Sequence, residues 1–133
     1  MILIDSNIPV YLAGAPGTRK TDTQHWLERL VSERQRLVTD AEVLQEILYR
    51  YSAINRPYDI PPAFDALLTV VDEVLPIDRA VVERAQQIVL SYPRLSARDS
   101  VHLAVMEQHG IERILTFDTG STVFPESPAS LSI

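Results

Sequence analysis

The chain of 133 residues contains no cysteine, which excludes a disulfide framework and a zinc site built from thiolates. Its three histidines, His25, His102 and His109, are too scattered to suggest a zinc triad. Of its twelve basic residues only Lys20 is a lysine, and the formal net charge is −6. This balance argues against a general coat for nucleic acid, but it leaves room for a local surface lined by arginines.

Long apolar runs are also lacking. No stretch approaches the roughly 18 consecutive apolar residues that span a membrane. The opening Met1-Ile2-Leu3-Ile4 leads directly into Asp5, without the basic segment that begins a signal peptide. We therefore expect a soluble, cytoplasmic protein.

The length suits a single domain covering residues 1–133, in which 121–133 form a tail rich in serine and proline.

Short apolar runs alternate with amphipathic segments along the chain. The runs predict buried strands at 2–4, 37–39, 74–77 and 114–117, with 131–133 as a candidate edge strand. Helical spacing of apolar residues predicts helices at about 21–34, 40–51, 64–71, 79–90 and 96–109, the last ending at Gly110 in the left-handed conformation. The segments 14–20 and 55–62, which contain proline or glycine, are expected to be loops.

Strands that alternate with helices predict an α/β fold. The expected architecture is a three-layer α/β/α sandwich, with a short parallel sheet of four to five strands flanked by helices on both faces. Ligands of such sheets bind beyond the carboxyl ends of the strands. Asp5 and Asp118 each follow a predicted strand at this edge.

Four acidic residues, Asp5, Glu46, Asp99 and Asp118, end predicted strands or lie on helices beside them. We expect the fold to gather them at one edge of the sheet. Carboxylates at close range oppose each other's ionisation unless they hold a cation, and magnesium prefers oxygen ligands. The pattern predicts a metal-dependent enzyme. Hydrolysis of a phosphodiester by metal-activated water suits it, because that reaction needs neither a histidine base nor a serine nucleophile.

Each acid also has a purely local interpretation. Asp5 can cap the following helix, and Glu46 can form an ion pair on a helix surface. Asp99 can complete a capping box, and Asp118 can belong to a turn. His102, three residues after Asp99, is interpreted as a packing or supporting group. A shared site is favoured because the local interpretation requires four separate coincidences.

Two further motifs imitate enzyme signatures. Asp118-Thr119-Gly120 matches aspartic proteases, but those enzymes are all-β proteins and only thirteen residues follow Gly120. Residues 14–21 differ from a phosphate-binding loop at Arg19, where that loop requires glycine. Neither interpretation explains the four acids.

Four segments, taken in order, resemble the PIN-domain family, and most closely its VapC toxins. They are Ile2-Leu3-Ile4-Asp5-Ser6-Asn7, Val43-Leu44-Gln45-Glu46-Ile47-Leu48, Leu95-Ser96-Ala97-Arg98-Asp99-Ser100-Val101-His102-Leu103-Ala104 and Ile114-Leu115-Thr116-Phe117-Asp118. The resemblance covers nearly the whole chain, and the segment around Asp99 is its most specific part.

The resemblance implies an endoribonuclease that depends on Mg²⁺ or Mn²⁺. It implies that Asp5, Glu46, Asp99 and Asp118 are catalytic. Asp5, Asp99 and Asp118 would bind the metal ion, and Glu46 would bind it directly or through water. Gly120 stands where many members of the family carry a further acid, so a second metal ion is not implied.

The resemblance further implies supporting residues and partners. Asn7 and Thr116 would orient the acids. The protein would be the toxin of a toxin–antitoxin pair, would stop translation by cutting RNA, would form a homodimer and would bind a small VapB-like antitoxin. Arg19 and Arg56, in the two predicted loops, are candidate contacts for RNA phosphates. Two alternatives stay open: a catalytically weak PIN-fold module that binds RNA or protein, and a housekeeping nuclease without an antitoxin.

Overall fold

The computed structural model describes residues 1–117 and 130–132, so Asp118, Gly120 and most of the tail lie outside the described residues. The elements in chain order are β1 (Ile2–Ile4), α1 (Asn7–Ala13), α2 (Thr18–Ser32), β2 (Leu37–Asp40), α3 (Ala41–Ala53), the 3₁₀ helix η1 (Pro57–Asp59), α4 (Ile60–Val70), β3 (Glu73–Leu75), α5 (Arg79–Ser91), α6 (Ala97–His109), β4 (Arg113–Thr116) and β5 (Ser130–Ser132). The predicted alternation of strands and helices is confirmed.

The strands form one parallel sheet in the order β3-β2-β1-β4-β5. The candidate edge strand of the tail is present as β5, one residue earlier than expected, and it pairs with β4. Strand β1 lies in the middle of the sheet between β2 and β4. Its carboxyl end therefore has a neighbouring strand end on each side, and this arrangement assembles the site described below.

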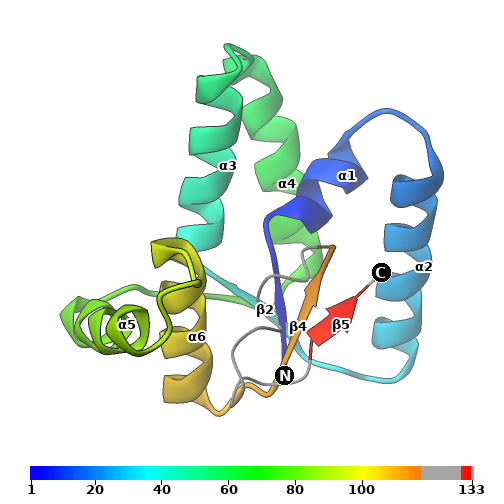
Figure 1. Cartoon of the computed structure of the whole chain (residues 1–133). Coiled ribbons are helices and arrows are strands. Elements are labelled where there is room, and N and C mark those ends of the chain that lie inside the picture. Colours follow the sequence, from blue (N-terminus) through cyan, green and yellow to red (C-terminus); the bar gives the residue numbers. More distant parts are fainter. Residues whose placement is uncertain (118–129, 133) are drawn as a thin grey trace.

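Two apolar cores cover the two faces of the sheet. Successive side chains of a strand point to opposite faces, and accordingly Ile2 and Ile4 pack with α1, α2, α3 and α4, whereas Leu3 packs with α5 and α6. All three of these side chains are fully buried. Figure 1 shows α5 and α6 on one side of the sheet and α1 and α2 on the other. The predicted three-layer α/β/α architecture is confirmed.

Local signals set several helix ends as expected. Asp40 caps α3 by accepting a hydrogen bond from the Val43 N–H at 2.9 Å, and Ser96 caps α6 by accepting one from the Asp99 N–H at 3.0 Å. Gly110 ends α6 with a φ of 66°, in the left-handed region that a residue without a Cβ adopts at little cost.

Among the described residues, no helix combines the length and apolar character needed to cross a membrane.

The two predicted loops were too long. Helix α2 already begins at Thr18, inside the predicted loop 14–20. The predicted loop 55–62 contains η1 and the first turn of α4, where Pro61 and Pro62 stand. Proline is tolerated there because the first N–H groups of a helix have no partner within the helix. The strand predicted at 74–77 instead ends at Leu75, before Pro76.

Removing an apolar side chain from one core tests the layered packing. Leu3 is fully buried, so Leu3→Ala is expected to lower the free energy of unfolding by about 2–5 kcal/mol. Leu90 on α5 is 75% exposed, and Leu90→Ala is expected to change it by less than about 0.5 kcal/mol. Urea unfolding of both variants followed by circular dichroism measures the difference. Equal losses in the two variants would contradict the assignment of Leu3 to the core.

Candidate active site

Polar side chains converge where three neighbouring parallel strands end. Asp5 follows β1, Asp40 ends β2 and Thr116 ends β4. Helices α3 and α6 add Glu46 and His102 to the same place. The site thus draws on five elements that are far apart in the sequence and meet only because the strands are parallel.

Asp5 is held by hydrogen bonds to both carboxylate oxygens. The Ser6 N–H donates to Oδ1 at 2.7 Å, and the Thr116 hydroxyl donates to Oδ2 at 2.7 Å. Burial raises the pKa of Asp5 above its usual value, with the charge of Glu46 adding to the rise, while His102 and the Thr116 hydrogen bond oppose it. Charge on Asp5 is therefore costly in this setting, and a nearby cation would lower that cost.

Asn7 connects α1 to the end of β4. Its side-chain N–H donates to the Thr116 hydroxyl oxygen at 3.2 Å, and its side-chain carbonyl accepts from the Phe117 N–H at 3.3 Å. The Thr116 hydroxyl thus receives a hydrogen bond from Asn7 and gives one to Asp5. This chain fixes the direction of the hydroxyl hydrogen and with it the position of the Asp5 carboxylate.

Glu46 points from α3 into the same cluster. Its Oε2 accepts a hydrogen bond from the Ser6 hydroxyl at 2.7 Å, and its Oε1 contacts Nε2 of His102. Each of Asp5, Glu46 and His102 offers a potential ligand atom, and these three atoms all lie within 4.8 Å of one another. The alternative in which Glu46 pairs with Arg50 on the helix surface is not what the structure contains, because its carboxylate is engaged by Ser6 and His102.

His102 joins two carboxylates through its two ring nitrogens. Nδ1 lies 2.6 Å from Oδ2 of Asp40, and Nε2 contacts Glu46. Ionised carboxylates only accept hydrogen bonds, so a ring bonded to two of them carries a proton on both nitrogens. Burial alone would lower the pKa of His102, but the charge of Asp40 and the hydrogen bonds to Asp40 and Glu46 outweigh it and raise the pKa well above its usual value.

Asp40 is the part of the site that the sequence interpretation missed, and His102 holds it to Glu46. Asp40 was interpreted only as a helix cap, which it is, but its second oxygen binds His102 and its side chain is fully buried. The signal that was available is its place at the end of a predicted strand, the same argument that selected Asp5. His102 was interpreted as a packing or supporting group, and it is 4% exposed.

The other two predicted acids stand differently. Asp99 lies in the first turn of α6, partly buried, three residues before His102 and on the same side of the helix. In the described part of the chain it does not belong to the cluster of atoms within 4.8 Å of one another. Asp118 lies outside the described residues. Geometry therefore brings together Asp5 and Glu46, and it adds His102 and Asp40 behind them.

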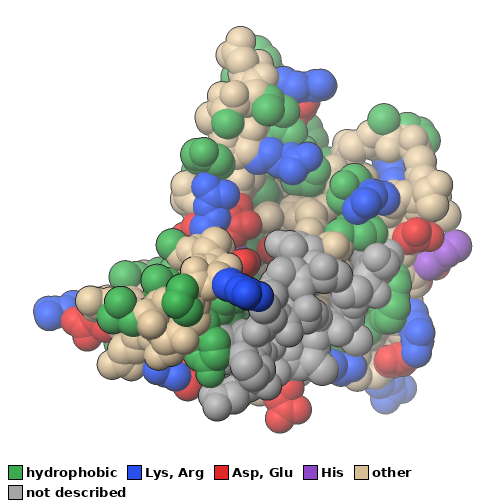
Figure 2. Space-filling view, viewed as in Figure 1, with side chains coloured by type: hydrophobic (Ala, Val, Ile, Leu, Met, Phe, Trp, Pro, Cys, Tyr) green, Lys and Arg blue, Asp and Glu red, His purple; other side chains and the backbone are tan. Residues whose placement is uncertain are grey.

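Basic side chains border the acidic cluster, as Figure 2 shows between α3 and α6. The guanidinium of Arg98, next to Asp99, lies 4.3 Å from the ring centroid of Tyr49 on α3. Arg19, a predicted RNA contact, lies 5.0 Å from the ring centroid of Phe117 and 5.3 Å from that of Tyr11. These cation–π contacts hold the arginines at fixed places without neutralising their charge.

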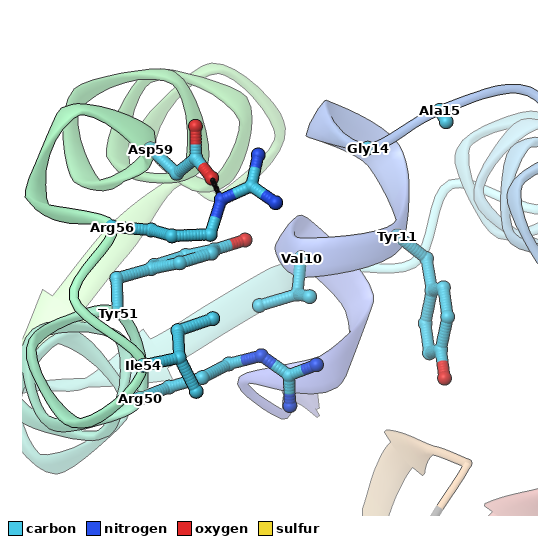
Figure 3. A pocket seen from close by; sticks show the side chains of 9 residues that line it. All are labelled: Val10, Tyr11, Gly14, Ala15, Arg50, Tyr51, Ile54, Arg56 and Asp59. Carbon is cyan, nitrogen blue, oxygen red and sulfur yellow. Dashed lines mark ion pairs between the residues drawn. The ribbon is translucent and has the colours of Figure 1, made fainter.

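Arg56, the other predicted RNA contact, lies in the chain just after the carboxyl-terminal end of α3. Its Nε lies 2.6 Å from Oδ2 of Asp59 in an exposed ion pair. Figure 3 shows Arg56 and Arg50 extending from the α3 side towards α1. The two predicted RNA contacts thus flank α1 on different sides, Arg19 beside Tyr11 and Arg56 beside the end of α3.

The chain matches known proteins over nearly its whole length. Residues 2–125 match the model of the PIN domain. Two curated relatives, a VapC ribonuclease of Mycobacterium bovis and ribonuclease VapC13 of Mycobacterium tuberculosis, are each 57% identical over 125 residues, covering 94% of this chain and 95% of the relative. Ribonuclease VapC23 of Mycobacterium tuberculosis is 34% identical over 118 residues, covering 89% of this chain and 93% of the relative.

Solved structures share the fold at lower sequence identity. VapC20 of Mycobacterium tuberculosis, a toxin that cleaves the sarcin–ricin loop, superposes with a TM-score of 0.73 at 22% identity, covering 92% of this chain and 95% of that one. VapBC2 of Rickettsia felis, bound to a DNA fragment from its promoter, gives a TM-score of 0.75 at 14% identity, covering 99% and 98%. Matching fold, matching family model and high identity to curated ribonucleases agree, and the chain therefore belongs to the PIN-domain family, among its VapC-type ribonucleases.

Proposed function

We propose that this chain is an endoribonuclease that requires Mg²⁺ or Mn²⁺ and acts as the toxin of a VapBC-type toxin–antitoxin pair. The observation that carries the proposal is the meeting of Asp5 and Glu46 with His102 at the carboxyl edge of the sheet, within a chain that matches the PIN domain over residues 2–125. Cleavage of RNA by this protein would inhibit translation and growth. Its place of action is then the cytoplasm, where RNA is translated.

The donor atoms of the cluster fit a hard divalent cation. Such ions take carboxylate oxygens, and magnesium usually takes only one or two of them directly. The burial that raises the pKa of Asp5 makes its charge costly without a cation nearby. We assign Asp5, Asp99 and Asp118 to the ion, with Glu46 bound directly or through water. When bound, the ion supplies the Lewis acidity that activates water and neutralises charge on the scissile phosphate.

Around these acids, other residues of the chain perform supporting roles. Asn7 and Thr116 hold Asp5 in one orientation through the hydrogen bonds described above. His102, held by Asp40, supports Glu46 from the interior and compensates part of the negative charge of the cluster. Groups that hold metal ligands in this way keep the ligands pointed at the ion before it binds.

RNA approaches from the exposed side, where the arginines lie. We assign Arg19 and Arg56 as contacts to phosphates. Arg19 keeps its full charge beside Tyr11 and Phe117. Arg56 is paired with Asp59 in a surface ion pair, which is weak in water, so a phosphate can replace the Asp59 carboxylate.

A small VapB-like antitoxin and a second copy of the chain are the proposed protein partners. Solved structures with this fold include VapBC2 of Rickettsia felis and a toxin–antitoxin complex from Klebsiella pneumoniae. Large apolar side chains on α3 and α4, such as Leu48 and Leu68, are about half exposed and supply surface for such contacts.

Loss of the Asp99 charge tests the nuclease. Asp99→Asn is expected to retain the fold, because the backbone N–H of residue 99 still donates its hydrogen bond to the Ser96 hydroxyl oxygen. Cleavage of RNA in Mn²⁺ is expected to fall by more than the roughly 100-fold that loss of a supporting residue costs a metal site. Gel analysis of cleaved RNA and circular dichroism measure both properties. Metal-independent cleavage by the wild type, or full activity of Asp99→Asn, would contradict the mechanism.

Loss of the His102 bridge tests the supporting role. A glutamine at this position carries a single nitrogen and cannot donate to Asp40 and Glu46 from opposite sides, so His102→Gln is expected to weaken Mn²⁺ binding about tenfold. Isothermal titration calorimetry measures the affinity without any turnover. His109→Gln, at the exposed end of α6, is the matched control and is expected to bind as the wild type does. Unchanged affinity in a folded His102→Gln protein would remove His102 from the site.

Expression in a bacterial host distinguishes a toxin from a housekeeping nuclease. The wild type is expected to arrest growth, and Asp99→Asn is expected to be harmless at the same protein level. Co-expression of a short protein encoded beside the gene is expected to restore growth. If the wild type cleaves RNA in vitro but its expression is harmless, the nuclease assignment stands and the toxin assignment is refuted. If the wild type neither arrests growth nor cleaves RNA, a binding module is favoured.

A further inference from the structure

A cleft of about 400 Å³ separates the carboxyl-terminal ends of α1 and α3 (Figure 3). Val10 and Gly14 line its α1 side, and Arg50, Tyr51 and Ile54 line its α3 side. A smaller hollow of about 180 Å³ shares five of its lining residues and adjoins it. The two hollows therefore form one depression alongside α1.

The cleft begins one helical turn from the acidic cluster. Arg50 follows Glu46 by four residues on α3. Residues four apart lie on the same face of a helix, about 6 Å apart along its axis. The α3 wall of the cleft therefore continues the helix face that carries Glu46, and α1 forms the opposite wall, so a chain bound at the acids can pass into the cleft.

Charge inside the cleft is unequally compensated. Arg56 is paired with Asp59 at 2.6 Å, whereas Arg50 has no carboxylate within ion-pair distance among the described residues. In Figure 3 the Arg50 guanidinium crosses from α3 towards the start of α1. In a protein of net charge −6, an exposed guanidinium without a counter-charge, one turn from a carboxylate cluster, is a specific place for an anion.

Two neighbours of Arg50 suit a nucleotide. Burial raises the pKa of Tyr51 above its usual value, even though Arg50 opposes the rise, so the phenol stays neutral and keeps its O–H as a donor. Figure 3 shows that hydroxyl directed to the space between α3 and α1. Ile54 is 55% exposed and gives an apolar surface of the kind that a ribose or a base covers.

We propose that this cleft is an RNA subsite in which Arg50 binds the phosphate of a nucleotide that flanks the cleaved bond. The inference rests on the proposed ribonuclease function. The acidic cluster repels phosphates on its own, so a strand that crosses it needs a cation close to each side, and Arg50 supplies one without first giving up a partner. The subsite positions substrate and takes no part in bond cleavage.

Binding of RNA is measured first, with cleavage removed. The probe is a fluorescein-labelled oligonucleotide of a sequence that the wild type cleaves, and the proteins carry Asp99→Asn so that the probe stays intact. Adding Arg50→Gln is expected to weaken binding about tenfold, because one charge-assisted contact is lost. The slope of log K against log salt is expected to become shallower by about 0.7 in the Arg50→Gln protein, the value for one single-stranded phosphate contact.

Matched variants separate this effect from general loss of charge. Arg79→Gln removes another exposed arginine, on α5, where Arg79 pairs with Glu83, and it is expected to bind RNA like the parent protein. Arg56→Gln is expected to have a smaller effect than Arg50→Gln, because Arg56 is already paired. In the active background, Arg50→Gln is expected to raise KM and leave kcat unchanged. Circular dichroism melting checks that each variant is folded.

Neutral phosphate replacements locate the contact. A set of oligonucleotides, each with one methylphosphonate, is expected to show one position beside the cleaved bond where the parent protein loses affinity and the Arg50→Gln protein does not. Equal sensitivity of both proteins at every position, or equal RNA affinity of both proteins, would overturn the subsite. An Arg50→Gln protein that binds RNA normally but fails to bind its antitoxin would assign the cleft to an acidic protein segment and overturn it as well. Absence of RNA cleavage by the wild type would overturn the proposed function, and the subsite with it.

Discussion

Mutual repulsion among closely spaced carboxylates that are buried or partly buried is the constraint on which this structure depends. Asp5, Asp40 and Glu46 meet at one edge of the sheet, where little water is present to screen their charges. Within the described chain, His102 is the group that offsets this repulsion from inside, because its ring is hydrogen-bonded to both Asp40 and Glu46. Without it, and without a bound cation, carboxylates of this cluster would have to take up protons or move apart.

The layered fold keeps that cluster in place. A parallel sheet ends its strands at a common edge, and two separate apolar cores, one on each face, keep the strands from shifting relative to the helices. Asp5, Asp40 and Thr116 take their places from the strands, whereas Glu46 and His102 take theirs from helices on opposite faces of the sheet. The geometry of the site therefore depends on the packing of all three layers. This packing holds the charged groups in fixed positions.

Positive charge is arranged around the outside of the acidic site in an otherwise acidic protein. Arg19 and Arg98 rest on aromatic rings, Arg56 is paired with Asp59, and Arg50 has no acidic partner in the described chain. These four arginines therefore differ in how far their charge is compensated, in a chain that belongs to a family of ribonucleases. Under the proposed function, the same charges hold phosphates close to carboxylates that repel them.

Much of the fold was determined by the sequence itself, because strand runs and helix caps are local signals. The β1 run from Ile2 to Ile4 and the left-handed Gly110 were predicted residue by residue, and Asp5, expected at a strand end, lies at the edge of the sheet where Glu46 and His102 also meet. The predicted loop 55–62 was wrong where proline stands in the first turn of α4, since proline signals a break as strongly as it permits a helix start.

Only the tertiary structure decided which polar groups meet. Asp40 carries an ordinary capping signal, and nothing local reveals that its second oxygen faces His102, which is 62 residues away. The position of Arg50 one turn beyond Glu46 was readable, but its lack of a counter-charge became clear only when Glu46 was found engaged by Ser6 and His102. Sequence patterns determine what each residue does for its own helix or strand, whereas hydrogen bonds and charge compensation across layers depend on distances that only the packed fold defines.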